Sequence, residues 1–299
     1  MSRWQRNAEA FAALLHAAAA AMRASPLRAR SVVRLPRRGR LLATGDLHDH
    51  QQHLDAVLRA ARLDESPDHH VVLHELIHGE RLVGGMDMSH RMLAAVAELV
   101  VERPGQVHPV LANHEIAQYR RQHISKGAGD NLELFDAGLD WVYGDDAGLA
   151  AEAIAAFIAA MPLAVRCDNG ILVSHSLPSA AQMRHFDLRV LERDLVEEDY
   201  DGPAGAAYLM TWGRGQPPEH LEALAREWGV RTFVVGHAHA ELGVEVRPPC
   251  MLVLNTDHAQ GRIVAIDLAA DAPDAAALRA CSEPVVNHIP LDLGEEDDA

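Results

Sequence analysis

The chain has 299 residues, of which 48% are hydrophobic, and it carries a formal net charge of −16. This length allows one large domain or two ordinary ones, with ample apolar material for a core. The negative charge argues against a specific role in binding nucleic acid or a membrane surface, because both depend on Lys and Arg side chains that neutralise phosphate.

The N-terminal segment differs from the rest of the chain in charge. Residues 1–40 contain nine Arg and a single acid, Glu9, so this segment has a net charge of +8. A helix is predicted over residues 7–23, because apolar residues recur there at near-helical spacing and Ser25-Pro26 follows. Binding of a polyanion stays open for this basic arm, but we favour a solvated helix and connector. An organelle transit peptide is a weaker alternative, since Ala and Arg are abundant along the whole chain.

The number and spacing of the cysteines indicate in which cellular compartment the protein is found. Cys167, Cys250 and Cys281 are an odd number and have no metal-like spacing, so neither a disulfide framework nor a zinc ribbon is indicated. The longest apolar run near the start, Phe11 to Met22, is too short to span a bilayer. We therefore expect a cytoplasmic protein that does not enter a membrane.

From Arg40 onward, short apolar runs of strand length recur, and most of them end in a cluster of metal-type ligands. The five runs with their clusters are LLAT before GDLHDH (41–50), HVVL before HELIHG (70–79), VHPVL before ANHE (107–115), ILVS before His175, and RTFVV before GHAHAE (231–241). Two further predicted strands, 251–255 and 262–268, carry no comparable cluster. Amphipathic helical stretches are predicted at 52–63, 88–101, 149–160 and 219–228.

This alternation of strands and helices indicates an α/β core. In such sheets ligands gather at the carboxyl ends of the strands, so the five clusters are expected to meet at one edge. No internal repeat or clear linker divides the chain. The acidic tail LGEEDDA (293–299) has little to bury and is predicted to be disordered.

Together the clusters offer carboxylates, an amide and several imidazoles. The residues are Asp46, His48, Glu75, Asn113, His114, His175, His237 and His239. A mixed set of nitrogen and oxygen ligands suits Mn, Fe or Zn, whereas Mg or Ca would favour oxygen alone. Two such metals about 3.5–4 Å apart generate a hydroxide nucleophile at neutral pH and clamp the oxygens of a phosphate. The set therefore predicts a hydrolase with a binuclear metal centre.

The order of these motifs resembles the calcineurin-like metallophosphoesterase superfamily. GDLH, a carboxylate after the second strand, NHE, a His after a strand, and GHAH follow one another as in that family. Three longer segments are similar to its serine/threonine protein phosphatase branch: ERPGQVHPVLANHE (102–115), VSHSLPS (173–179) and YLMTWGRG (208–215). The resemblance covers roughly residues 40–270.

The resemblance implies a fold and roles for single residues. The fold would be α/β, a sandwich of two mixed β-sheets flanked by helices, with the metal site at the carboxyl ends of the strands. Residues 1–39 would form an N-terminal helix and basic connector, 40–270 the catalytic domain, and 271–299 an extension with an acidic tail. Asp46, His48 and His239 would bind the first metal, Asn113, His175 and His237 the second, and Glu75 would bridge both. His114 would protonate the leaving oxygen, and Arg214 would grip the phosphate.

The sequence departs from the family pattern at its second motif. The family has Gly-Asp-x-x-Asp, and this chain has His74-Glu75-Leu76-Ile77-His78. The bridging Asp becomes the longer Glu75, and the Asp that orients the acid histidine becomes His78. Other departures are Asp49 and Leu111 at positions where the family has Gly and Arg, and Arg81 is a displaced candidate for a further phosphate-binding Arg.

The function that we expect is hydrolysis of phosphomonoesters, including Ser/Thr phosphates of phosphoproteins or small phosphoesters. Hydrolysis of dinucleoside polyphosphates is the nearest alternative on the same fold. A rival of another class is a zinc metalloprotease, because HELIH matches H-E-x-x-H, with His74, Glu75 and His78 as its site and Glu98 as a further ligand. A catalytically impaired binding module is the third hypothesis, motivated by Glu75 and His78.

Overall fold

The computed structural model of the protein describes residues 7–123 and 129–290, and two β-sheets form its centre. The smaller sheet has the strand order β14-β13-β3-β4-β7. Its strands are β3 (Arg40–Asp46), β4 (His69–His74), β7 (Val107–Pro109), β13 (Arg262–Asp267) and β14 (Glu283–Pro284). Because β3, β4 and β7 run parallel, their carboxyl ends meet at one edge of this sheet.

The larger sheet has the order β1-β2-β8-β9-β10-β12-β11. Its strands are β1 (Arg28–Ala29), β2 (Val32–Leu35), β8 (Ala164–Cys167), β9 (Ile171–Ser174), β10 (Thr232–Val235), β11 (Val244–Arg247) and β12 (Met251–Leu254). The strands β9, β10 and β12 are parallel, as are β2 and β8, while β8 is antiparallel to β9 and β11 is antiparallel to β12. Both sheets are therefore mixed, as the resemblance implies.

One hydrophobic cluster fills the space between the two sheets. It contains Leu41, Val72, Val173, Val234 and Leu252, all fully buried. The neighbouring residues along the same strands, such as Leu42 and Leu73, belong to a second and larger cluster under the helices. Strand alternation therefore gives each sheet one face toward the other sheet and one face toward helices, and both faces are apolar.

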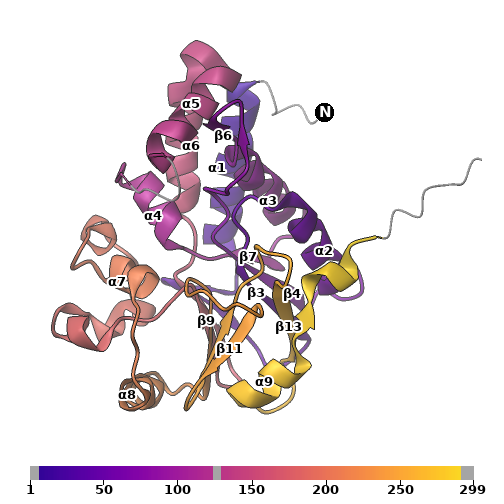
Figure 1. The fold of residues 1–299 in the computed structure, drawn as a ribbon, viewed down its shortest axis with the longest axis vertical. Coiled ribbons are helices and arrows are strands. Elements are labelled where there is room, and N and C mark those ends of the chain that lie inside the picture. The colour runs from indigo at the N-terminus through magenta and orange to yellow at the C-terminus, as the bar shows by residue number, and fades with distance from the viewer. Residues whose placement is uncertain (1–6, 124–128, 291–299) are drawn as a thin grey trace, which may run out of the picture.

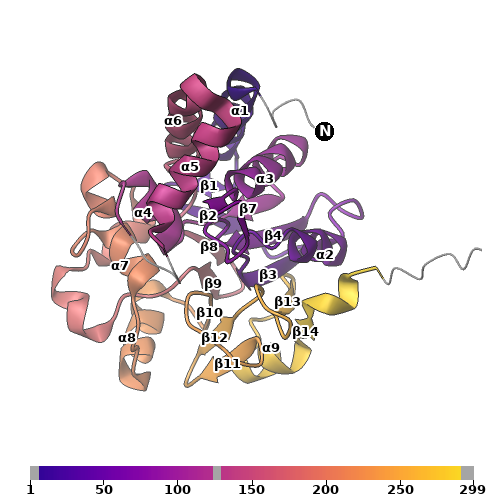
Figure 2. The same cartoon turned by 45° about the horizontal axis from the view of Figure 1, so that its top comes forward.

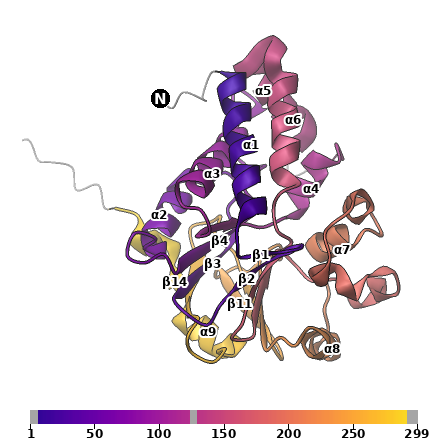
Figure 3. The ribbon, with the colours of Figure 1, turned by 180° about the vertical axis from the view of Figure 1, so that it is seen from behind.

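Helices cover the outer faces of this sandwich (Figure 1, Figure 2). Their bounds are α1 (Ala8–Ala24), α2 (Gln51–Ala61), α3 (His90–Glu102), α4 (Asn113–Tyr119), α5 (Asn131–Tyr143), α6 (Ala147–Ile158), α7 (Ala206–Trp212), α8 (Pro218–Trp228) and α9 (Ala275–Cys281). The N-terminal helix α1 lies lengthwise against α6 and also packs on α3 (Figure 3). Phe11 and Leu15 of α1 are fully buried, so this helix is part of the core on one face and not solvated all round.

The sequence predicts most of these elements within a few residues. The seven strands and five helices expected from hydrophobic periodicity all form. Residues of the expected basic connector, however, form β1 and β2 at the edge of the larger sheet. No helix among the described residues is long and apolar enough to cross a membrane.

HELIHG forms no helix. His74 ends β4, and the backbone at Glu75 and His78 has left-handed φ values of 45° and 60°. Histidines at positions i and i+4 converge on one ion only on a helix, so this segment lacks the geometry that a zinc protease requires. The metalloprotease hypothesis is therefore wrong for these residues.

Candidate metal centre

The predicted ligand clusters converge where the parallel strands end. Asp46 is the last residue of β3, and Glu75 follows β4 directly. Asn113 is the first residue of α4, which follows β7. His175 and His237 follow β9 and β10 in the other sheet. The site therefore joins the ends of both sheets.

Four side chains crowd around one point. Nε2 of His175 lies 2.7 Å from Oδ1 of Asn113 and 2.7 Å from Oε2 of Glu75. Nδ1 of His237 lies 3.0 Å from the same Asn113 oxygen. Glu75, His175 and His237 each present one ligand atom within 4.8 Å of the others, and all three are buried. Oxygen and nitrogen atoms facing one another in this way form a donor set that fits a divalent cation.

Asp46 lies next to this group and ties the two sheets together. Its carboxylate accepts a hydrogen bond from the backbone N–H of His237, with distances of 2.9 and 3.2 Å to its two oxygens. Its Oδ1 also lies 3.5 Å from Nδ1 of His175. The backbone at Asp46 forms a parallel bridge to Asn255, which follows β12. The Asp46 side chain is thus fixed by groups from the opposite sheet.

Gly236 allows this approach. A Cβ at Gly236 would lie only 2.3 Å from Oδ1 of Asp46, so no other residue fits there without displacing the carboxylate. After Gly236 the chain turns sharply: the N–H of Ala238 bonds the carbonyl of Gly236 at 2.7 Å, and His237 has a φ of 62°. This turn lets both His237 and His239 line the cleft although they are two residues apart.

Strained backbone gathers at the same place. Left-handed φ values occur at His48, Asp49, Glu75, His78 and His237, all of which carry side chains. Such conformations cost free energy and persist only where surrounding structure holds them in place. Here the loops that follow the strands are bent to bring their side chains together.

A cleft of about 370 Å³ opens above the group. It is lined by all nine site residues expected from the sequence except the fully buried His175, and also by Trp212, Asn255 and Asp257. His48 lies in the cleft wall with its Nδ1 3.1 Å from the carbonyl of Ile77. His239 is exposed, and its ring centroid lies 6.0 Å from that of His258. His48 and His239 therefore line the cleft outside the close cluster of Glu75, Asn113, His175 and His237.

Arg214 reaches the cleft from the loop after α7. Its Nε donates to Nε2 of His237 at 3.0 Å, while Trp212 stacks on Tyr208 instead of on the guanidinium. Ser176 holds this loop by donating to the carbonyl of Gly213 at 2.6 Å. The segments YLMTWGRG and VSHSLPS are thus joined, which aims Arg214 at the metal-binding group.

His114 lies beside the carboxylate of Glu75. Its Nε2 lies 3.4 Å from Oε1 of Glu75, and its ring centroid lies 5.4 Å from that of His48. The ring of His78 is also 5.4 Å away, on another side. The histidine expected to act as an acid therefore lies at the edge of the candidate ligand set.

His78 has a carboxylate partner that the sequence analysis did not identify. Nδ1 of His78 lies 2.7 Å from Oδ2 of Asp87, at the end of the hairpin β5 (Leu82–Val83) to β6 (Met86–Asp87), and both side chains are less than 5% exposed. Ser89 holds the pair: its N–H donates to Asp87, and its hydroxyl accepts from the N–H of His78. His78, at the sequence position where the family motif has Asp, is thus paired with the carboxylate of Asp87.

Burial favours the neutral form of His74, His175 and His237. Burial, followed by the neighbouring charges of His48 and Arg214, lowers the pKa of His175 well below its usual range. Burial, followed by His175, also lowers the pKa of His74, and the same causes with Arg214 lower the pKa of His237 to about 2. Neutral imidazoles have the lone pair that a metal ligand needs.

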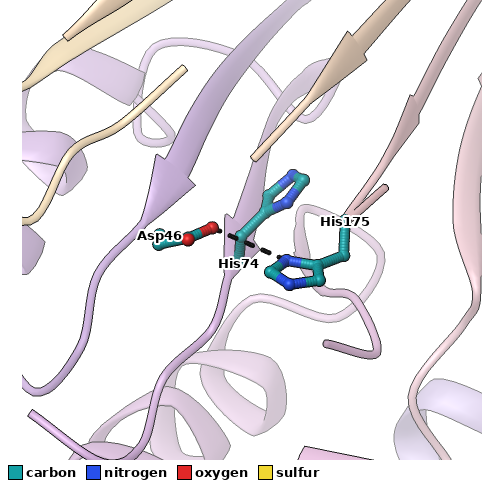
Figure 4. Close-up of side chains that lie close together, drawn as sticks. All are labelled: Asp46, His74 and His175. Atoms are coloured by element: carbon teal, nitrogen blue, oxygen red, sulfur yellow. Dashed lines mark ion pairs between the residues drawn. The ribbon is translucent and has the colours of Figure 1, made fainter. Parts of the chain in front are cut away.

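The sequence analysis also missed His74 and Asn255 as members of the site. His74, expected as a ligand only under the metalloprotease hypothesis, forms a compact group with Asp46 and His175 (Figure 4). Asn255 follows β12 as the recognised ligands follow their strands, so its position was a usable signal. Asp87 gave no such signal, because only folding of the hairpin brings it to His78.

A two-sheet α/β sandwich with carboxylate, amide and imidazole ligands at its strand ends defines a metal-dependent phosphoesterase. The sequence model of the family described as calcineurin-like phosphoesterase matches residues 39–241, and the chain belongs to this family. It is accordingly a hydrolase that acts on phosphoester bonds. No curated protein sequence matches the chain.

Two solved structures share the fold. One is a protein serine/threonine phosphatase from Saccharomyces cerevisiae with similarity to human phosphatase PP5, at 15% identity and a TM-score of 0.61, covering 87% of this chain and 82% of the other. The second is a cold-active protein-tyrosine phosphatase from a Shewanella species, at 15% identity and a TM-score of 0.57, covering 79% and 77%. At 15% sequence identity, this similarity shows a shared fold and nothing beyond it.

Proposed function

We propose that this protein is a phosphatase with two divalent metal ions that hydrolyses phosphomonoesters, including Ser/Thr phosphates of proteins. The observation that carries the proposal is the meeting of Glu75, Asn113 and His175 within 2.7 Å contacts at the floor of an open cleft. Nε2 of His175 has at most one hydrogen and can donate it to only one of the two oxygens that Glu75 and Asn113 present, whereas a shared cation would engage all three ligand atoms.

The ligand sets follow from these positions. Glu75, Asn113, His175 and His237 would hold one ion, since their ligand atoms already face one another. Asp46, His48 and His239 would hold the other ion, with Glu75 shared between the two. Mn, Fe and Zn suit this mixture of nitrogen and oxygen donors.

Metal ions held by these residues would make a water molecule more acidic and would neutralise charge on the phosphate. The chain supplies the remaining functions. Arg214 borders the cleft beside His237, where its terminal amino groups can bind phosphate oxygens. His114, next to Asn113, donates a proton to the leaving oxygen, so that an alkoxide need not be expelled. No covalent enzyme intermediate is required.

The substrate class is proposed on two grounds. The loops that carry His175 and Arg214 resemble those of the serine/threonine protein phosphatase branch, and they are joined by the Ser176–Gly213 hydrogen bond. The cleft is also open enough for a phosphorylated side chain that projects from a protein surface. We further propose a cytoplasmic location, because the three cysteines are free thiols.

The test combines metal analysis with activity. Metals are counted by elemental analysis of the purified protein, and hydrolysis of p-nitrophenyl phosphate, a phosphoserine peptide and diadenosine tetraphosphate is measured with added Mn²⁺. Asn113→Ala is expected to lose one metal and the activity. His185→Ala, an exposed histidine outside the cleft, is the matched control and should behave as wild type.

Three outcomes would contradict the proposal. Fewer than two bound metals per chain after Mn²⁺ loading would rule out the proposed binuclear centre. Faster hydrolysis of the dinucleotide than of either monoester would move the protein to the polyphosphate alternative. Two bound metals with no hydrolysis of any of the three substrates would favour an impaired binding module.

A further inference from the structure

His74 is a fully buried histidine with no apparent structural function. It is the last residue of β4, is 0% exposed, and pairs in register with Asp46 of β3. Neither ring nitrogen of His74 has a hydrogen-bond partner among residues 7–123 and 129–290. A neutral imidazole carries one N–H donor and one lone pair, and burying both without a partner costs free energy. An apolar side chain of similar size would avoid that cost.

The surroundings of His74 are those of a metal ligand. Asp46, His74 and His175 each present one ligand atom within 4.8 Å of the others, and Figure 4 shows the three side chains together. Oδ1 of Asp46 and Nδ1 of His175 are 3.5 Å apart. Ligands of one divalent ion, each about 2.1 Å from it, lie up to about 4.2 Å from one another. Small side-chain shifts would therefore let the three share an ion.

Gly236 leaves room between Asp46 and His74. A Cβ on Gly236 would lie 2.3 Å from Oδ1 of Asp46 and 3.3 Å from Nδ1 of His74, so a side chain there would intrude between them. Because Gly236 has no side chain, the chain just after β10 passes this point without separating the His74 nitrogen from the Asp46 oxygen. Both atoms are of the types that bind divalent cations.

We propose that His74 is an additional ligand of the metal centre, giving a ring nitrogen to the ion that Asp46 binds. The inference rests on the proposed function, since it assumes that a metal occupies the site. It also gives the departure at position 74 a chemical role, because a histidine stands there where the family motif has Gly and adds a neutral nitrogen donor beside Asp46.

The test compares His74→Leu with His90→Leu. His90 in α3 is a matched control, because it is likewise buried, at 1% exposure, and its Nδ1 also lacks a hydrogen-bond partner among the described residues. His90 does not belong to any of the candidate ligand groups in the same part of the chain. Metal affinity is measured by chelator competition with Mn²⁺, and thermal unfolding is followed for metal-free and Mn²⁺-loaded protein. The visible d–d spectrum of the Co²⁺-loaded protein reports directly on the ligands.

For His74→Leu we expect at least about a tenfold weaker affinity for one of the two ions. Its metal-free form should unfold at the same temperature as wild type or higher, while the rise in Tm on adding Mn²⁺ should be smaller. The Co²⁺ spectrum should change. His90→Leu should alter Tm equally in both forms and leave affinity and spectrum unchanged. His74→Gln serves as a second polar variant should the Leu variant fail to fold, with the same expectations for affinity and spectrum.

Unchanged metal affinity in both His74 variants would overturn the proposal. A weaker affinity with an unchanged Co²⁺ spectrum would also overturn it, because His74 would then act on Asp46 and not on the metal. If wild type itself binds no metal, the proposed function fails. If wild type binds two ions and the variants match it, only the role of His74 fails.

Discussion

The imidazole of His78 and the carboxylate of Asp87 form a buried pair, with Nδ1 and Oδ2 separated by 2.7 Å. His78 stands where the family has the Asp that orients the acid histidine, and its ring lies beside that of His114. A carboxylate is thus present next to His78, but it belongs to Asp87. The ring of His78 contacts Asp87 and also lies beside His114. We therefore propose that His78, anchored by Asp87, positions the ring of His114.

Asp87→Asn tests this relationship. Removing the charge from a pair that is less than 5% exposed should lower the free energy of unfolding by about 3 kcal/mol. It should also reduce kcat by about tenfold, since the His78 ring loses its anchor, while two metals stay bound. Urea unfolding, steady-state kinetics and metal counting are the measurements. Val83→Ala on the same hairpin is the control for loop damage, and a kcat loss equal to that of Asp87→Asn would contradict a specific role of the carboxylate.

The same pair predicts a pH dependence of stability. Burial alone would raise the pKa of Asp87, but hydrogen bonds from His78 and Ser89 outweigh burial and lower it below the ordinary 3.8. A carboxyl with a lowered folded-state pKa contributes stability that is fully present above its unfolded pKa and is lost as the pH falls through the folded value. The stability difference between wild type and Asp87→Asn should therefore be constant near neutral pH and shrink below about pH 4. A difference that grows on acidification would contradict this.

His114→Ala should separate acid catalysis from metal binding. We expect kcat for a phosphoserine peptide to fall by about 100-fold or more, because an alkoxide leaves slowly without a proton donor. For p-nitrophenyl phosphate the fall should be much smaller, since nitrophenolate leaves without protonation. Elemental analysis should still find two metals. Equal losses on both substrates would indicate that His114 positions Glu75, 3.4 Å away, and does not donate the proton.

Glu75→Asp tests the second departure. The φ of Glu75 is 45°, in the left-handed region that Asp adopts more readily than Glu, so the change relieves strain. The shorter side chain must then be compensated by a rotamer change. We expect both metals to stay bound and activity to be kept or raised. Loss of both metals from the folded variant would mean that the extra methylene of Glu75 is required to reach His175.

Glu115 supports the loop that carries Glu75. Its Oε1 accepts from the backbone N–H groups of Leu76 and Ile77, at 2.8 and 3.3 Å, in a fully buried setting. Glu115→Ala would leave these donors unpaired and should cost about 1–3 kcal/mol of stability. Glu115→Gln keeps an acceptor oxygen and should retain most of that stability and the metals. Equal unfolding free energies for the two variants, measured in urea, would contradict the role of the acceptor.

The sequence predicts the site residues that lie at strand ends, but not those that reach the site through packing of a hairpin. Asp46, Glu75, Asn113, His175 and His237 each lie at the end of a strand or within four residues after it, and the parallel strands of each sheet end at the same edge. Their meeting could therefore be predicted from order along the chain. The partner of His78 could not, because Asp87 lies on a hairpin whose position depends on packing against α5. The proposed division at residues 39 and 270 remains a prediction.

The sequence by itself determined the kind of protein. Hydrophobic periodicity set the strands and helices, and the order of ligand clusters set the family, because both are properties of neighbouring residues. Only the tertiary structure decided what HELIHG does. Strand register turns His74 inward toward Asp46, the left-handed bend at Glu75 aims its carboxylate at His175, and the hairpin brings Asp87 to His78. These three contacts depend on how the sheets and loops pack in space, and a pattern of adjacent residues does not encode that packing.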